Sequence, residues 1–169
     1  LEVAVFAYFC FAGKYAVVSV DYLLDKHFTP QINYGGISQR LASEGIAIET
    51  LTAQQLRDII IDIRREKLPD PKVIGNAGSF FMNPIVGYAL FEQIRTKYPQ
   101  IPHYFIDQDN VKIPAAWLIE QCGWKGKSLG NAAVHQQQPL VLINKGNASG
   151  RDIKCLSDRI QHDVFEKFS

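Results

Sequence analysis

The chain has 169 residues, of which 47% are apolar and 21% are charged, a composition typical of an ordinary globular protein with a sizeable core. Its 18 basic and 17 acidic side chains leave a net charge of +1, which argues against a nucleic-acid-binding protein. No run of about 18 apolar residues occurs, so the sequence predicts no membrane-spanning helix.

The cysteines and histidines indicate neither a disulfide framework nor a metal site. Cys10, Cys122 and Cys155 are odd in number and widely spaced, without a CxxC pair. Three reduced thiols in a cytoplasmic protein are the simplest interpretation. The histidines are scattered, and no HExxH or similar paired spacing occurs, so no metal ligand is predicted. Nothing in the pattern indicates an oligomer.

The first predicted element is a strand at residues 14–24, KYAVVSVDYLL, because apolar and polar residues alternate there and Val and Tyr are frequent. The stretch TPQINYGGIS that follows is predicted to be a loop because of its paired glycines. Residues 41–48 are ambiguous between helix and strand. We expect both ends of the sequence to be cuts through a longer chain, since it opens inside an apolar segment and closes just after an amphipathic helix.

A helix is predicted over residues 52–67, and it has the clearest signals of any element. Thr52 is a good N-cap, and Gln55 follows three residues later with the spacing of a capping box. Pro69 prevents the helix from continuing. The apolar positions follow the i, i+3, i+4, i+7 rule of one helix face: Leu56, Ile59, Ile60 and Ile63.

The rest of the chain mixes helices with short strands. The last helix begins at Ser149, with Asp152 at the capping-box position. Because no regular βαβ repeat occurs, the sequence predicts an α+β fold with mixed or antiparallel sheets flanked by helices. The remaining elements are predicted as helices at 88–98 and 114–122, and as strands at 103–107, 128–135 and 140–144.

The last turn of the helix at 52–67 carries cations on or beside its apolar face. At about 100° per residue, Lys67 falls about 20° from Leu56, inside the apolar stripe, and Arg64 falls about 80° away, at its edge. Arg65 points to the opposite side. One interpretation is that these cations only offset the helix macrodipole and extend their stems to water. The other is that Lys67 projects past the core edge into a cleft and meets an anion.

The segment that follows, KLPDPKVIGNAGSFFMNP, concentrates residues that shape the backbone or offer amide groups. Asn76, Gly78 and Asn83 are examples, and glycines let a backbone approach a ligand closely. The pattern GNAGS is neither the GxGxxG fingerprint of dinucleotide-binding folds nor the GxSxG of lipase-type hydrolases. The residues alone leave two alternatives: a turn in which Ser79 is satisfied locally, or an anion or nucleotide site with a hydroxyl at its floor.

Three stretches of the sequence resemble a known family. They are KLPDPKVIGNAGSFFMNP, KIPAAWLIEQCGWKGKSLGNAAVHQQQPLVLINKGNASGRDI and the short INYGGI. All three are similar to the UDP-N-acetylenolpyruvoylglucosamine reductase family, in its type I form with a tyrosine-bearing insertion. The resemblance implies a cytoplasmic flavoenzyme of peptidoglycan synthesis, in which NADPH reduces bound FAD and flavin N5 then delivers a hydride to the enolpyruvyl UDP-sugar.

The resemblance also implies roles for particular residues. Ser79, in NAGSFF, matches the serine that donates a proton to the substrate carbon. Gln138, in HQQQPL, matches a contact to the substrate nucleotide, and Arg64 matches an arginine near the flavin ring. The family's contacts to the substrate diphosphate match three further residues: Tyr34, Lys67 and Asn83.

A division of the chain follows from the same resemblance. Residues 1–72 would be the remainder of an FAD-binding-type domain, and residues 73–169 would be a substrate-binding C-terminal domain. In the family, the main FAD domain precedes the matching segment, and a second acid, a glutamate, follows the last helix. The family's Tyr-Arg-x-Ser arginine has no counterpart in FAYFCFAGKY. The 169 residues alone are therefore expected to be inactive. The alternatives are a non-catalytic UDP-sugar-binding fragment or module, and a plain structural domain.

Overall fold

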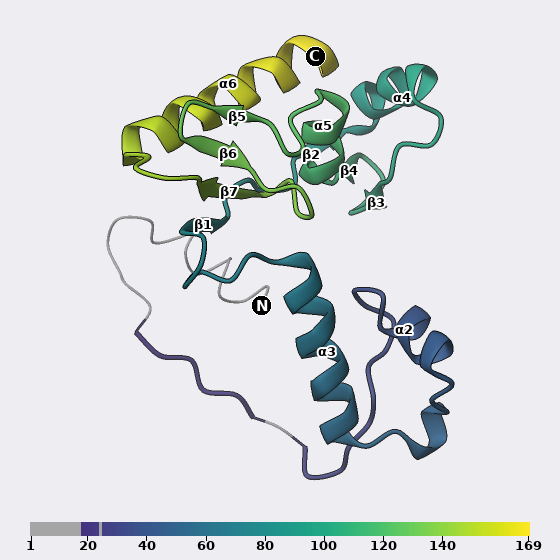
Figure 1. Ribbon diagram of the computed structural model, residues 1–169. Coiled ribbons are helices and arrows are strands. Elements are labelled where there is room, and N and C mark those ends of the chain that lie inside the picture. The colour runs from purple at the N-terminus through teal and green to yellow at the C-terminus, as the bar shows by residue number, and fades with distance from the viewer. Residues whose placement is uncertain (1–17, 24) are drawn as a thin grey trace.

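Two antiparallel sheets and five α-helices form the part of the chain that the computed structural model describes, residues 18–23 and 25–169 (Figure 1). The fold is α+β, which confirms the predicted class. Sheet A has the order β1–β7–β6–β5, with bounds Asn76–Ser79, Val141–Asn144, Ala132–Val134 and Ser128–Leu129. Sheet B has the order β2–β4–β3, with bounds Ile85–Gly87, Asn110–Lys112 and Tyr104–Phe105.

Sheet A packs against a helix on one face and against a connecting segment on the other. Its side chains alternate between the two faces along each strand. Figure 1 shows α6 (Gly150–Phe168) and α3 (Ala53–Lys67) on opposite sides of this sheet. The face toward α6 forms a buried cluster of Ile119, Ala132, Val134, Leu142, Leu156 and Ile160. The other face holds a smaller cluster, in which Leu68 and Ile74 cover Ala133, Val141 and Ile143.

The predicted N-terminus of the last helix is confirmed in detail. Ser149 Oγ accepts a hydrogen bond from Asp152 N at 3.3 Å, and the Asp152 carboxylate accepts one from Ser149 N at 2.7 Å. The two bonds close a reciprocal capping box. The hydrogen bonds from the Ser149 backbone and hydroxyl hold the pKa of Asp152 below its ordinary value, because they favour the charged carboxylate.

Sheet B shares a buried core with two further helices, α4 (Tyr88–Lys97) and α5 (Ala115–Gln121). Phe91 of α4 is fully buried, and the end of α6 closes the same core with Phe168. The predicted helices at 88–98 and 114–122 are therefore confirmed to within one or two residues. The members of this core are Phe91, Ile94, Ile101, Val111, Ile113, Leu118 and Phe168.

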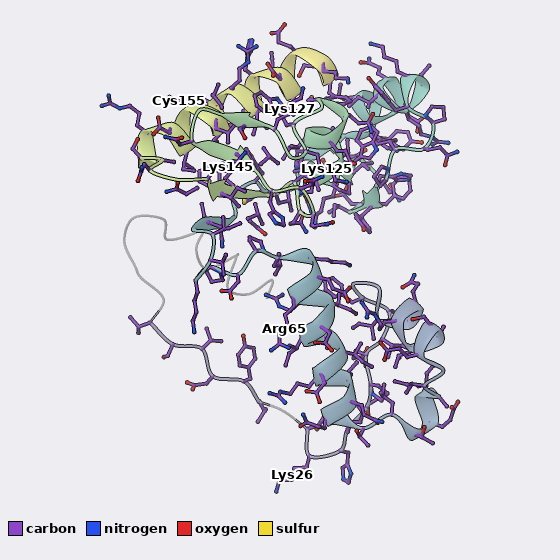
Figure 2. The ribbon with its side chains drawn as sticks, in the orientation of Figure 1. Lys26, Arg65, Lys125, Lys127, Lys145 and Cys155 are labelled. Atoms are coloured by element: carbon purple, nitrogen blue, oxygen red, sulfur yellow. The ribbon has the colours of Figure 1, made fainter. Side chains whose placement is uncertain are left out.

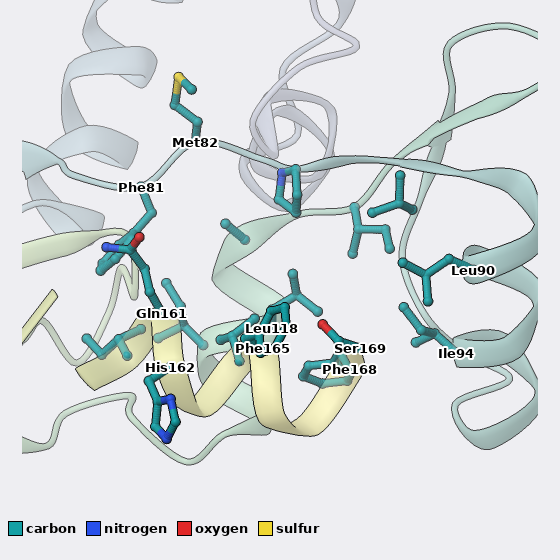
Figure 3. A pocket seen from close by; sticks show the side chains of 17 residues that line it. Phe81, Met82, Leu90, Ile94, Leu118, Gln161, His162, Phe165, Phe168 and Ser169 are labelled. Carbon is teal, nitrogen blue, oxygen red and sulfur yellow. The ribbon is translucent and has the colours of Figure 1, made fainter. Parts of the chain in front are cut away.

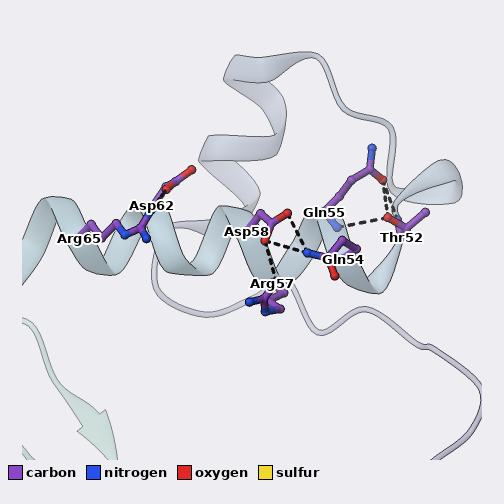
Figure 4. Close-up of polar contacts among 7 residues, drawn as sticks. All are labelled: Thr52, Gln54, Gln55, Arg57, Asp58, Asp62 and Arg65. Atoms are coloured by element: carbon purple, nitrogen blue, oxygen red, sulfur yellow. Dashed lines mark hydrogen bonds and ion pairs between the residues drawn. The ribbon is translucent and has the colours of Figure 1, made fainter.

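The N-terminal part of the described chain is a pair of packed helices, α2 (Ile37–Glu44) and α3 (Ala53–Lys67), joined through the short 3₁₀ turn Ile48–Thr50. Figure 4 shows the α3 capping box, in which Thr52 N donates to Gln55 Oε1 at 2.9 Å, as predicted. It also shows the polar side of α3. The apolar stripe buries against α2 in a cluster of Ile37, Leu41, Leu51, Leu56, Ile59 and Ile63.

Two sequence predictions of local structure need correction, and some strands were missed. The predicted strand at 14–24 is wrong over residues 18–23, which are exposed and lie in no strand; its other residues lie outside the described ones. An extended segment with no neighbouring strand leaves its backbone groups unpaired, so alternation alone does not make a strand. The stretch 128–135 is not one strand, because Gly130, at φ +60°, turns β5 back on β6. Strands β1, β2 and β4 were not predicted.

Cys122 and Cys155 are free thiols, whereas Cys10 lies outside the described residues. Burial raises the pKa of the Cys122 thiol, because desolvation disfavours the thiolate.

Among the described residues, no three His, Cys, Asp or Glu side chains gather closely enough to hold a metal ion. The described helices also include none with the length and apolar content needed to cross a membrane.

The Asp163 side chain connects α6 to the turn after α5, so its removal should lower the free energy of unfolding. Its carboxylate accepts a hydrogen bond from Trp124 Nε1 at 2.9 Å and pairs with Arg159 Nε at 3.0 Å. We expect Asp163→Ala to reduce the free energy of unfolding by about 1–3 kcal/mol, because the half-buried indole N–H loses its partner. Urea denaturation measures this change. Arg159→Ala removes only the exposed partner and should cost less than about 1 kcal/mol; equal losses would contradict this account.

Candidate functional site

Lys67 reaches back from the end of α3 to the turn that precedes α2. Its Nζ donates a hydrogen bond to Gly35 O at 3.1 Å. A Cβ added at Gly36 would lie 3.8 Å from the same Nζ, so the ammonium sits directly against this turn. Tyr34, next in the turn, has 83% of its surface exposed. The structure therefore brings two of the predicted site residues, Tyr34 and Lys67, to one corner of the helix pair.

The helix pair itself fixes this corner. Gly36 is the N-cap of α2 and has a left-handed φ of +88°, a conformation that favours glycine. Arg40 of α2 pairs with Glu66, the residue beside Lys67, and lies 3.6 Å from Glu44. The pairing with Glu66 raises the pKa of the Arg40 guanidinium. The ion pair between Arg40 and Glu66 therefore adds a polar contact between α2 and α3, beside their apolar contact.

The two arginines of this turn have different surroundings. Arg65 pairs with Asp62 at 3.5 Å and points away from α2, as the helical wheel predicts (Figure 2). Arg64 is exposed, and no ion pair to it occurs among the described residues. Its guanidinium is therefore available to a negatively polarised group.

Ser79 is the last residue of β1, an edge strand of sheet A, and it is exposed. It lies opposite Val141 of β7, and the next residue, Phe80, donates its N–H to Leu140 O at 2.8 Å. The hydroxyl therefore sits on a strand that is anchored on both sides of it. Figure 1 shows β1 at the border between sheet A and the segment that comes from α3.

Gln138 lies in the turn between β6 and β7, beside the strand that holds Ser79. Its N–H donates to His135 Nδ1 at 3.2 Å, and its carbonyl oxygen accepts from Val141 N at 3.0 Å. Val141 is also the cross-strand partner of Ser79, so one residue of β7 contacts both the Gln138 turn and the strand that carries Ser79. Because Nδ1 accepts, the neutral His135 ring carries its proton on Nε2. Sequence reasoning missed His135, treating it as a scattered histidine, since its partner is a backbone group.

Asn83 lies between β1 and β2 in the sequence and contacts the first residue of α5. Its Oδ1 accepts a hydrogen bond from Ala115 N at 2.9 Å, which satisfies one of the free N–H groups of the helix N-terminus. With the oxygen engaged, the amide N–H₂ remains as the donor that Asn83 presents to a ligand. The structure thus places the six predicted residues in three local groups: Tyr34, Arg64 and Lys67; Ser79 and Gln138; and Asn83.

A cleft in the described structure lies apart from these residues. Its volume is about 560 Å³, and it lies between the segment 81–86, α4, α5 and the end of α6 (Figure 3). The lining is mainly apolar, with Gln161, His162 and Ser169 as its polar members. None of the six predicted site residues lines it, and apolar walls do not suit a diphosphate. The six predicted site residues therefore lie outside this cleft.

Comparison with known proteins identifies the family of this chain. Residues 70–169 match the family described as UDP-N-acetylenolpyruvoylglucosamine reductase, C-terminal domain. A UDP-N-acetylenolpyruvoylglucosamine reductase of Bacteroides fragilis is 52% identical over 153 residues, which are 90% of this chain and 45% of the relative. The enzyme of the same name from Burkholderia vietnamiensis is 46% identical over 156 residues, or 92% of this chain and 45% of that relative. The chain spans about half the length of these relatives. It belongs to the UDP-N-acetylenolpyruvoylglucosamine reductase family.

Proposed function

We propose that this chain supplies the nucleotide-sugar site and the proton donor of an NADPH- and FAD-dependent reductase that converts UDP-N-acetylglucosamine enolpyruvate to UDP-N-acetylmuramate, for peptidoglycan synthesis in the cytoplasm. The observation that carries the proposal is the exposed Ser79 on an anchored strand, within a chain whose residues 70–169 match the family. In this proposal Tyr34, Lys67 and Asn83 bind the diphosphate, and Gln138 binds the nucleotide.

Ser79 acts on the carbon that becomes basic during the reaction. Addition of hydride to the terminal vinyl carbon leaves the electron pair of the former double bond on the neighbouring carbon, beside the carboxylate. This carbanion is a strong base, so even a neutral hydroxyl protonates it when the hydroxyl is held close by. Ser79 Oγ gives up its proton, a C–H bond forms, and the serine regains a proton from solvent. Lys67 offsets substrate charge during the same step.

FAD, when bound, supplies the hydride, and NADPH restores it. Among the residues of this chain we assign only Arg64 to the flavin, because its guanidinium is exposed, forms no ion pair within the described part of the chain and fits the electron-rich edge of a flavin ring. The other flavin contacts fall to protein outside this chain.

We also propose a domain boundary near residue 72. Among the described residues, the buried members of the cluster between α2 and α3 fall between residues 37 and 63, and those of the other clusters fall from residue 91 onward. Leu68 and Ile74, on either side of this boundary, pack against one face of sheet A. Separate cores of this kind are typical of separate domains.

Reductase activity of the intact protein tests the proposal. Purified protein is mixed with NADPH and the enolpyruvyl UDP-sugar, and NADPH oxidation is followed alongside the visible absorbance of the flavin. Oxidation that requires the UDP-sugar supports the proposal. Colourless protein that still binds the UDP-sugar would replace it with the non-catalytic binding module. Protein that binds neither FAD nor UDP-sugar overturns both.

Two substitutions of Asn83 separate its two hydrogen-bonding roles. Asn83→Asp keeps an oxygen that accepts from Ala115 N, but it loses the amide donor and adds a negative charge. We expect it to unfold at the normal temperature and to bind the UDP-sugar at least about tenfold more weakly. Asn83→Ala loses both roles and should also lower the unfolding temperature. Normal affinity in the aspartate variant, measured by calorimetry, would remove Asn83 from the diphosphate site.

His135 should affect nucleotide binding through Gln138. His135→Leu removes the acceptor of the Gln138 N–H, and we expect about 2- to 10-fold weaker binding of UDP. His135→Asn places an amide oxygen near the position of Nδ1 and should restore most of this loss. The double variant with Gln138→Ala should bind no more weakly than Gln138→Ala alone, because both act through one contact. Additive losses would contradict the coupling, and Gln137→Ala, at an exposed residue of the same turn, is the control.

A further inference from the structure

Between their paired positions, β1 contains one residue more than β7. Asn76 lies opposite Ile143, whereas Ser79 lies opposite Val141. Three steps along β1 therefore match two steps along β7, which is the definition of a β-bulge. The bulge is bounded by regular contacts, since Asn144 N donates to Gly75 O and Phe80 N donates to Leu140 O, both at 2.8 Å.

This extra residue decides the face of sheet A on which Ser79 lies. In a regular strand, side chains alternate, so residues three apart lie on opposite faces. Directly opposite residues of neighbouring strands lie on the same face. Because Val141 and Ile143 are two residues apart on β7, they share a face, and the bulge brings Ser79 onto the face that Asn76 occupies.

The two faces offer very different surroundings to a hydroxyl. Val141 and Ile143 belong to the cluster that Leu68 and Ile74 cover, on the side of the segment that follows Lys67. Without the bulge, and with Asn76 still opposite Ile143, Ser79 would pair with Leu140. Leu140 packs against the opposite cluster, with Leu142 and α6. The regular strand would thus turn the hydroxyl toward the core, away from the Lys67 side.

Two residues hold the bulge in place. Gly78 has φ +64°, in the left-handed region that side chains disfavour. A Cβ added at Gly78 would have no atom within 4 Å, so the backbone conformation, and not space, requires glycine. Asn76 Oδ1 accepts a hydrogen bond from Gly78 N at 3.0 Å, which closes a local turn around Ala77.

We propose that Asn76 and Gly78 are positioning residues that direct the Ser79 hydroxyl to the substrate face of sheet A. The proposal rests on the function proposed above for Ser79. It assigns no chemical step to either residue. Their role is to keep the proton donor on the side of the sheet where the nucleotide sugar is expected to lie.

Substitutions of Gly78 in the intact, flavin-bound protein test this role. Asparagine tolerates the left-handed conformation, whereas valine strongly disfavours it and favours a regular strand. We expect Gly78→Asn to retain at least about a third of the rate of substrate reduction, and Gly78→Val to lose at least about tenfold. Reduction of the flavin by NADPH, measured separately by stopped flow, should stay unchanged in both variants.

Asn76→Ala provides a second, milder test if the valine variant does not fold. It removes the side-chain bond to Gly78 N and the longer one from Asn76 Nδ2 to Ile74 O at 3.5 Å, but it keeps the glycine, so a smaller loss of the same half-reaction is expected. Equal loss of both half-reactions, or unchanged substrate reduction in both Gly78→Val and Asn76→Ala, overturns the positioning role. Ser79→Ala separates this failure from that of the proposed function: if that variant reduces substrate normally, the proton-donor assignment itself is wrong, and the positioning role falls with it.

Discussion

Ser79→Ala is expected to slow reduction of the enolpyruvyl UDP-sugar by about 10²–10⁴-fold, the range in which a positioned general acid contributes. The hydroxyl is the proton source for the carbon beside the carboxylate, so its removal leaves that carbon to water. Flavin reduction by NADPH involves no proton from this serine and should proceed at the normal rate. Stopped-flow measurement of the two half-reactions in the intact protein separates these effects.

The surroundings of Ser79 allow an effect on catalysis to be distinguished from an effect on stability. The residue is exposed at the end of an edge strand, and no hydrogen bond involves its hydroxyl among the described residues, so alanine should leave the unfolding temperature nearly unchanged. Ser128→Ala is the matched control, because Ser128 lies on β5, the other edge of sheet A, and its hydroxyl accepts one exposed hydrogen bond, from Lys145 Nζ at 3.3 Å. If both half-reactions fall together in Ser79→Ala, the serine supports the site and does not act as its acid.

Sequence reasoning identified elements that are determined locally. The two capping boxes, at Thr52 and Ser149, depend on residues three apart, and both form as predicted. Strand β1 was missed because its hydrogen-bond partners lie in β7, far along the chain, and because a bulge breaks the alternation of its side chains. The pattern of a short bulged strand resembles that of a turn until its partner is known.

The same distinction applies to the candidate site. The helical wheel placed Lys67 on the side of the apolar stripe, and its Nζ indeed lies against the turn before α2. That the partner would be Gly35 O could not be predicted, since the contact requires α2 to pack on α3 first. The support of Gln138 by His135 was missed for a similar reason, because it forms only when β6 and β7 pair. Periodicity gives the direction of a side chain, whereas its neighbours depend on tertiary packing.

Lys67→Ala is expected to weaken binding of the UDP-sugar by about 10- to 150-fold, which corresponds to about 1.5–3 kcal/mol for a hydrogen bond to a charged group. Within the described structure, the Lys67 ammonium is exposed and its hydrogen bond goes to the neutral Gly35 carbonyl. No carboxylate there neutralises its positive charge, so the whole charge is available to attract a diphosphate. Calorimetric titration of the intact protein with UDP-sugar measures the loss. The affinity of the wild-type protein should fall with rising salt, and the alanine variant should show a weaker salt dependence.

Arg65→Ala is the control that distinguishes a specific contact from a general surface charge. Arg65 lies in the same turn of α3 and carries the same charge, but it pairs with Asp62 and points away from α2. Its removal should change the affinity by less than about twofold, since an exposed charge on that side is screened by solvent. Equal losses in Lys67→Ala and Arg65→Ala would show that the helix end attracts the nucleotide only through its net charge. In that case the corner formed by Tyr34 and Lys67 would not be the diphosphate site.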